Sequence, residues 1–215
     1  VWLNDGSGFF TDSGQTLGSL ATRSAALADL NGDGNLDVFF NNNNGGAEVW
    51  LNNGLGTFTT SGQFLASFST FSSRDVELAD LDGDGDIDAF MAVYGGNQVW
   101  LNDGSGYFAG NGQTLGSSTS WDVALGDIDD DGDVDAFVTN LFGEANRVWL
   151  NDGSGNFTDS GQALGSGNST GVAMGDLDGD GDLDAFVSSN SGTAEVWLND
   201  GSGTFVTNGQ SFVST

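Results

Sequence analysis

The chain has 215 residues, of which 31 are acidic and 3 are basic, so its formal net charge is −28. Such a charge argues against nucleic acid as a partner and against insertion into anionic membranes. The sequence has no Cys, which excludes disulfides and thiolate metal sites, and no run of 18 apolar residues that could span a membrane.

The opening residues, Val1-Trp2-Leu3-Asn4, include neither an initiator Met nor a signal peptide, so we expect a piece of a longer protein. The string V-W-L-N then recurs at intervals of 48 to 50 residues, with its tryptophan at Trp2, Trp50, Trp100, Trp149 and Trp197. A period near fifty indicates a solenoid, a propeller or a tandem array. We expect a single repeat domain, 1–215, with units 1–48, 49–98, 99–147 and 148–195 and a partial unit 196–215.

Each repeat predicts four short strands, which we call A to D in the order in which they surround an acidic loop. Around the third acidic loop, strand A is 123–126 and strand B alternates apolar and polar residues over 134–138. Strand C is 147–150, the Asx-Gly turn 151–155 follows it, and strand D carries Phe157. Four antiparallel strands per repeat are typical of a propeller blade. We therefore predict an all-β propeller with about four full repeats and a half repeat.

The recurring aromatic residues allow two interpretations. The tryptophans, with the phenylalanines of strand D, could form a ladder on which sugars stack. Because they recur at fixed strand positions, we expect them to form the core between adjacent blades instead. The phenylalanines in question are Phe10, Phe58, Phe108, Phe157 and Phe205.

An acidic nine-residue loop lies between strands A and B of every full repeat, at 29–37, 80–88, 127–135 and 176–184. Carboxylate or amide oxygens occupy positions 1, 3, 5 and 9, and position 6 is always Gly. This spacing matches the start of an EF-hand loop, but a strand begins at position 9 where an EF-hand would continue to its Glu. Oxygen ligands in this number favour Ca²⁺, with position 7 contributing its backbone carbonyl. The alternative is a solvated acidic turn.

We expect about four Ca²⁺ ions, one per loop, with a structural role. The predicted ligand residues are Asp29, Asn31, Asp33, Asn35, Asp37, Asp80, Asp82, Asp84, Asp86, Asp88, Asp127, Asp129, Asp131, Asp133, Asp135, Asp176, Asp178, Asp180, Asp182 and Asp184. The first loop has only three acids and predicts the weakest site. The third loop has Asp130 where the second and fourth have Gly, and Asp tolerates the left-handed backbone expected there.

The D-x-D-G-D-G-D-x-D loop, followed by D-A-F-V and then by V-W-L-N-D-G-S-G-x-F, resembles the FG-GAP and VCBS-type repeats. Such repeats also occur in the integrin α-subunit head and in propeller lectins. The resemblance implies Ca²⁺ in the A–B loops, an extracellular or cell-surface location, and the adhesion or carbohydrate binding found in some members. We expect the protein to be bacterial. Family propellers usually have seven blades, whereas this chain has four full repeats and a half. The Phe-Gly and Gly-Ala-Pro strings that name the family are absent.

The B–C and D–A connections vary between repeats, whereas the A–B loops and C–D turns barely change. Diversified loops favour recognition of a partner, although drift under weak constraint would produce the same pattern. The residues we expect to contact a ligand are Phe71, Arg74, Tyr94, Trp121, Phe142 and Arg147.

The sequence is compatible with three kinds of function. The first is a binding or adhesion module that recognises a glycan or an extracellular protein through the variable loops. The second is a structural subunit of a filament or adhesin stalk, which self-associates through its opening half-blade because that half-blade has no A and B strands. The third is an enzyme, and we expect none, because His, Cys and Lys are absent and the four glutamates form no catalytic motif.

Overall fold

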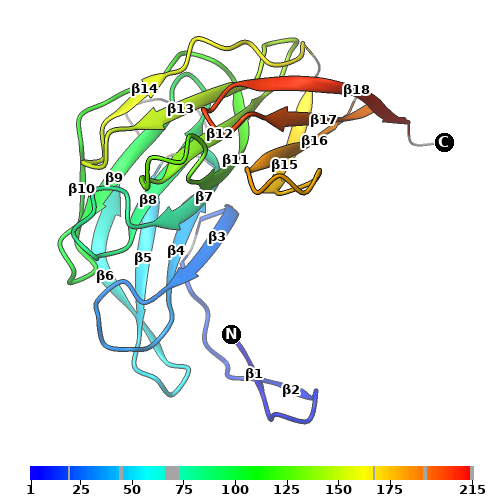
Figure 1. The fold of residues 1–215 in the computed structure, drawn as a ribbon. Helices are drawn as coiled ribbons and strands as arrows, with labels where there is room; N and C mark the ends of the chain where they lie inside the picture. The colour runs from blue at the N-terminus through cyan, green and yellow to red at the C-terminus, as the bar shows by residue number, and fades with distance from the viewer. Residues whose placement is uncertain (19, 44–45, 66–72, 167, 191–192, 214–215) are drawn as a thin grey trace.

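The computed structural model describes residues 1–215 except 19, 44–45, 66–72, 167, 191–192 and 214–215. The described residues contain eighteen strands and no helix. They therefore include no helix that could span a membrane. A hairpin pairs β1 (Trp2–Asn4) with β2 (Phe10–Asp12), and four antiparallel sheets of four strands follow. We call these sheets blades 1 to 4. They succeed one another along the chain without closing into a ring (Figure 1).

The strand order in every blade follows the chain. Blade 1 contains β3 (Thr22–Ala28), β4 (Asp37–Asn42), β5 (Ala47–Asn52) and β6 (Phe58–Leu65). Blade 2 contains β7 (Ser73–Ala79), β8 (Asp88–Val93), β9 (Gln98–Asn102) and β10 (Phe108–Gly110). Blade 3 contains β11 (Ser120–Gly126), β12 (Asp135–Asn140), β13 (Arg147–Asn151) and β14 (Phe157–Asp159). Blade 4 contains β15 (Ser169–Gly175), β16 (Asp184–Ser189), β17 (Thr193–Asn199) and β18 (Phe205–Val213). The predicted A–B–C–D meander is confirmed.

Successive blades are in contact through their A strands. A register shift interrupts the pairing of strands A and B near the start of each strand A, as between Ser120 and Asp122 in β11. Beside this bulge, Val172 N in blade 4 donates a hydrogen bond of 2.8 Å to Asp122 Oδ2 in blade 3. Ser24 Oγ in blade 1 likewise donates to Asp75 Oδ1 in blade 2 over 2.7 Å. The bulged strand therefore supplies polar links that the regular ladder would not provide.

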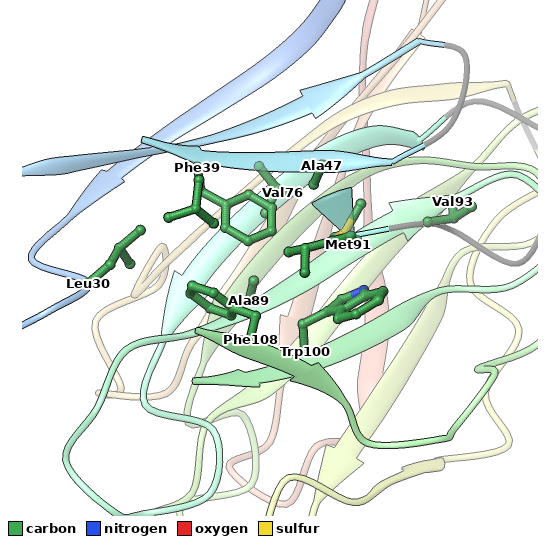
Figure 2. Packing of buried hydrophobic residues seen from close by; sticks show 11 residues of the cluster. Leu30, Phe39, Ala47, Val76, Ala89, Met91, Val93, Trp100 and Phe108 are labelled. Carbon is green, nitrogen blue, oxygen red and sulfur yellow. The ribbon is translucent and has the colours of Figure 1, made fainter. Parts of the chain in front are cut away.

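The hydrophobic core lies between the blades, at three junctions that are each formed by two successive sheets. At every junction the strand B phenylalanine of one blade meets the strand D phenylalanine of the next, edge to face. The ring centroids are 5.2 Å apart for Phe39 and Phe108, and 5.3 and 5.4 Å apart at the next two junctions. Figure 2 shows the first junction, where Trp100 lies beside these rings.

The interpretation of the aromatic residues as core is confirmed for blades 2 to 4. Trp50 and Phe58 of blade 1 are only partly buried, and Trp2 and Phe10 of the hairpin are exposed, contrary to the prediction.

A glutamine from the D–A connection fixes the register between neighbouring blades. Gln113 Nε2 donates to Phe157 O over 3.1 Å, and Phe157 N donates back to Gln113 Oε1 over 2.9 Å. The same two-bond clip joins Gln15 to Phe58 and Gln63 to Phe108. Both bonds reach main-chain groups of the strand D residue, so the contact does not depend on the side chain of that residue.

The asparagine that ends V-W-L-N also connects blades. Asn151 Nδ2 donates to Leu81 O in the preceding blade over 2.8 Å and to Val134 O in its own blade over 3.1 Å. Asn102 and Asn199 repeat this bridge at the other two junctions. The sequence pattern showed this residue only as the end of a strand.

Replacing Gln113 by Ala should destabilise the fold by about 1–3 kcal/mol, because the buried main-chain groups of Phe157 lose both partners. The free energy of unfolding in urea, at saturating calcium, measures this change. Gln210→Ala is the matched control, since among the described residues Gln210 bonds only to Asn208. Equal stability of the two variants in dilute solution would contradict the role assigned to the clip.

Candidate metal centre

The four acidic loops connect strand A to strand B, where the sequence predicted them. Each starts after the last residue of strand A and ends on the first residue of strand B. The glycine at position 6 has a positive φ in every loop, between 86° and 104°. Residues other than Gly rarely adopt this backbone conformation. This turn folds the loop back so that its side chains converge.

Carboxylates from positions 1, 3 and 9 come together in three of the loops. Their oxygens lie within 4.8 Å of one another, which is close enough to hold one metal ion. The three groups are Asp80, Asp82 and Asp88; Asp127, Asp129 and Asp135; and Asp176, Asp178 and Asp184.

The aspartate at position 9 is fully buried and serves as the anchor of the loop. Asp135 Oδ2 accepts a hydrogen bond from Ile128 N over 3.0 Å, and Asp135 Oδ1 accepts one from Asn151 N over 2.8 Å. The same pair of bonds recurs at Asp37, Asp88 and Asp184. Burial raises the pKa of Asp88 and of Asp135 to about 6, while these hydrogen bonds oppose the rise.

Two oxygen atoms in the third loop suit a bound cation. Asp127 Oδ1 and Asp129 Oδ1 are buried and have no hydrogen-bond partner. A buried carboxylate oxygen without a partner is costly, and a cation at the centre of the group would satisfy both. The donor set is all oxygen, which is the set that hard divalent cations prefer.

Position 5 was predicted to contribute its carboxylate and position 7 its backbone carbonyl. The structure places the carboxylates of both positions outside the three groups. Asp131 Oδ1, at position 5, accepts a hydrogen bond from Asp133 N over 2.9 Å, which shapes the turn. The Asp133 side chain, at position 7, lies against Gly153 of the C–D turn, where an added Cβ would come within 2.6 Å of its carboxylate. Asn35, Asp86 and Asp182 lie in the same way against Gly54, Gly104 and Gly201.

The first and third loops depart from the consensus without changing its shape. In the first loop, Asp29 accepts hydrogen bonds from Asp33 N and Gly34 N, although Asn31 replaces an acid at position 3. In the third loop, Asp130 has a φ of 59°, where the second loop has Gly83 at 76°. The expectation that Asp130 would take the left-handed backbone is confirmed.

The five described residues of the predicted ligand set lie in blades 2 and 3. The Arg74 guanidinium lies 4.4 Å from the centre of the Trp121 ring, across the junction of blades 2 and 3. Phe142 is exposed with a φ of 57°, and Tyr94 pairs through its backbone with Thr119. Phe71 lies outside the described residues.

Arg147 borders a cavity of about 210 Å³ between blades 2 and 3. Its Nη1 donates to Gln162 O over 3.0 Å and lies 3.8 Å from Asp159 Oδ2. Trp149, Asp159, Asn97 and Asn140 also line the cavity. The cavity thus combines an aromatic ring with charged and amide groups. The sequence pointed to Arg147, but it gave no signal that these other residues would meet there.

Sequence reasoning also missed a pair of acids on the A strands. Burial is the main reason that the pKa of Asp122 is raised to about 7. A hydrogen bond to the Asp75 carboxyl and repulsion from its charge raise this pKa further, whereas the hydrogen bond from Val172 N lowers it. The protonated Asp122 carboxyl can therefore donate to Asp75. Only the packing of neighbouring blades brings these two residues together.

Stability should consequently fall as the pH rises through about 7. The pKa of Asp122 in the fold lies above its ordinary value of 3.8, so its stabilising contribution is complete below 3.8 and is lost as the carboxyl ionises. At saturating calcium, the unfolding free energy should decrease by roughly 1–2 kcal/mol between about pH 5 and pH 8, less than the full pKa shift would give because water screens the partly exposed carboxyl. Asp122→Asn should remove most of this slope, and an unchanged slope would assign it to other groups.

Repeated four-stranded blades with an acidic loop between strands A and B define a propeller-type repeat protein. The model of the FG-GAP-like repeat matches residues 29–91, 80–138 and 127–187, and the chain belongs to this family. A comparison with curated proteins finds no match.

Solved structures support the same architecture. The chain is 25% identical to an Agrocybe aegerita lectin that recognises non-reducing terminal N-acetylglucosamine, with a TM-score of 0.56. It covers 50% of that protein, which in turn matches 87% of this chain. BBS1N, solved in complex with ARL6DN, is 11% identical with a TM-score of 0.62, over 92% of this chain and 58% of BBS1N. The chain therefore spans little more than half of these proteins.

Proposed function

We propose that this chain is an extracellular, calcium-stabilised binding module that recognises a glycan or a protein through its B–C and D–A loops. The observation that carries the calcium assignment is the third loop, where Asp127, Asp129 and Asp135 converge and two buried oxygens have no protein partner. Millimolar extracellular calcium would be sufficient for sites of this kind. We further propose that the chain has no catalytic activity.

Calcium would act on the fold through charge and geometry. Positions 1 and 3 come from the loop, and position 9 is the first residue of strand B, so an ion bound between them ties the loop to the sheet. Burial is the larger cause of the raised pKa of Asp82 and of Asp129, and repulsion from neighbouring carboxylates adds to it. A bound calcium ion would offset this repulsion.

Calcium binding can be tested with two variants that remove the same charge from one loop. Asp129→Ala should eliminate about one of four Ca²⁺ ions in a calorimetric titration, because it removes a group member. Asp133→Ala should retain the full number, because its carboxylate lies against Gly153. At a calcium concentration of 100 times Kd, the loss of one site corresponds to about 2.7 kcal/mol of stability. An unchanged melting temperature in excess chelator would contradict a structural role for calcium.

The cavity beside Arg147 is the part of the variable end best suited to a glycan. A sugar is commonly held by a few directed polar groups in a concave site, and Arg147, Asp159 and Asn97 offer such groups beside the largely buried Trp149. Similarity to a lectin that recognises terminal N-acetylglucosamine supports a sugar ligand. The similarity to BBS1N, solved in complex with ARL6DN, supports a protein partner in its place.

A glycan array that includes terminal N-acetylglucosamine tests the sugar assignment. Arg147→Ala should weaken binding of any glycan that is found by at least about tenfold, because it removes a charged hydrogen-bond donor. Arg23→Ala is the matched control, since Arg23 is on blade 1 and donates to Asn43 Oδ1. Equal losses in the two variants, or no glycan bound at all, would favour a protein partner.

A second candidate function is a structural subunit that associates with itself, as in a filament or a stalk. The observation that favours it is the uncovered apolar surface at both ends of the row of blades. Trp2 and Phe10 of the hairpin are exposed, as are Phe186 and Phe212 of blade 4. Contiguous exposed apolar patches commonly mark interaction sites, whereas single exposed apolar residues do not.

A further inference from the structure

The residue two positions before the strand C tryptophan differs from blade to blade. It is Glu48 in blade 1, Gln98 in blade 2, Arg147 in blade 3 and Glu195 in blade 4. In blade 1, Glu48 Oε2 accepts a hydrogen bond from Trp50 Nε1 over 3.2 Å. The N–H edge of that indole therefore faces the side chain at the varying position, which decides what partner the tryptophan finds.

In blade 3 the residue at this position cannot accept a hydrogen bond. Arg has N–H donors but no acceptor, and the Arg147 side chain extends to strand D, where its Nη1 donates to Gln162 O. Trp149 is 7% exposed, and its Nε1 is buried without a hydrogen-bond partner. Trp100 and Trp197 also lack a partner, but the residue two positions before each of them carries an acceptor oxygen. At Trp149, by contrast, no rotation of that side chain supplies an acceptor.

The unpaired N–H of Trp149 belongs to the wall of the cavity of about 210 Å³ between blades 2 and 3, which Arg147 also lines. Gly116 lies against the indole, since an added Cβ would come within 3.2 Å of Trp149 Cζ2. Asn97 lines the same cavity and is 2% exposed. Its Oδ1 accepts from Val93 N over 3.2 Å, and no described residue accepts from its Nδ2. The wall thus presents N–H donors from a tryptophan, an arginine and an asparagine.

We propose that this cavity binds the carboxylate of an acidic sugar at the end of a glycan. The ligand carboxylate supplies the acceptor that Glu48 supplies in blade 1. One of its oxygens accepts from Trp149 Nε1, and the other accepts from Arg147 and Asn97. A buried N–H without a partner is costly, and an anionic acceptor satisfies it with a charge-assisted hydrogen bond. The inference rests on the proposed glycan-binding function and names the class of sugar.

The size and the acceptors of the cavity favour a terminal sugar. Its volume is below the roughly 300–1,000 Å³ of sites that enclose a drug-sized ligand, so it admits one end unit of a chain. Asp159 also lines it and can accept hydrogen bonds from sugar hydroxyl groups. An acidic sugar carries a carboxylate and hydroxyl groups in one unit, whereas the C-terminus of a peptide offers the carboxylate alone.

The charge of the protein opposes this ligand at a distance but not in contact. The net charge of −28 repels an acid, yet salt screens that repulsion beyond about 8 Å at physiological ionic strength. Within the cavity, Asp159 Oδ2 lies 3.8 Å from Arg147 Nη1 and is the nearby like charge. Asp159→Asn keeps an acceptor oxygen and removes this charge, so it should strengthen binding of the acid several-fold. Weaker binding in this variant would contradict a carboxylate as the bound group.

A glycan array at saturating calcium tests the proposal and should show binding to glycans that end in a carboxylated sugar such as a uronic acid. Conversion of that carboxylate to its methyl ester should weaken binding at least about tenfold, because the ester removes the charge and leaves the ring unchanged. Arg147→Glu should abolish binding, since it restores the acceptor of blade 1 and repels the ligand. Arg23→Glu, the same charge change on blade 1, is the matched control and should bind like wild type.

The indole N–H of Trp149 gives a direct measurement of the contact. In ¹⁵N-labelled protein its proton resonance, assigned with Trp149→Phe, should move downfield on binding because the N–H gains an acceptor. The resonance of Trp50 should stay in place, since this N–H already donates to Glu48. In Arg147→Glu the Trp149 resonance should be downfield without ligand, which also verifies that the variant folds.

The outcomes separate the class of sugar from the proposed function. Neutral glycans that bind through Arg147 as tightly as acidic ones would overturn the carboxylate assignment alone. Acidic glycans that bind Arg147→Glu like wild type, or that leave the Trp149 resonance in place at saturation, would overturn the site. An array on which no glycan binds would overturn both the inference and the glycan function, and binding of carboxylated peptides in their place would assign the cavity to a protein partner.

Discussion

A hydrogen-bonded line that runs from loop to loop across the blades connects the acidic loops to the hydrophobic core. In blade 3, Ile128 N and Asn151 N both donate to the buried Asp135 carboxylate. The Asn151 side chain then donates to Leu81 O, in the loop of blade 2. Leu81 N in turn donates to Asp88, and the pattern repeats at each complete junction. Because every member is a buried polar group, the whole line must form together if none is to remain unsatisfied.

This line explains why acidic loops and aromatic junctions recur with one period. The residue at loop position 2 packs its side chain into the junction core. Its N–H donates a hydrogen bond to the position 9 aspartate, and its carbonyl accepts one from the asparagine of the next blade. An ion held by positions 1, 3 and 9 would therefore stabilise the loop and, through position 9, the contact with the neighbouring blade. Metal binding and blade packing are expected to be coupled through Asp88, Asp135 and Asp184.

The sequence predicted the strands, the loops and the core aromatic residues because these depend on local periodicity. V-W-L-N alternation, the Asx-Gly turn and the glycine at position 6 each specify backbone shape within a few residues. The clip glutamines were missed, since Gln113 meets Phe157 only 44 residues later. The Asp75–Asp122 pair and the cavity beside Arg147 were missed for the same reason. The carboxylates at position 5 were assigned to the ion by spacing alone, whereas in the third loop the Asp131 carboxylate accepts a hydrogen bond from Asp133 N.

Because the three junctions between complete blades use equivalent residues, the blades resemble interchangeable modules. Duplication or deletion of one whole period of 48 to 50 residues would join two blade faces of the same kinds that meet at these junctions. The new junction would have its clip, its aromatic pair and its bridging asparagine without further mutation. Recombination between repeats can thus change the length of the array in a single step, while the variable loops of the duplicated blade become free to diverge.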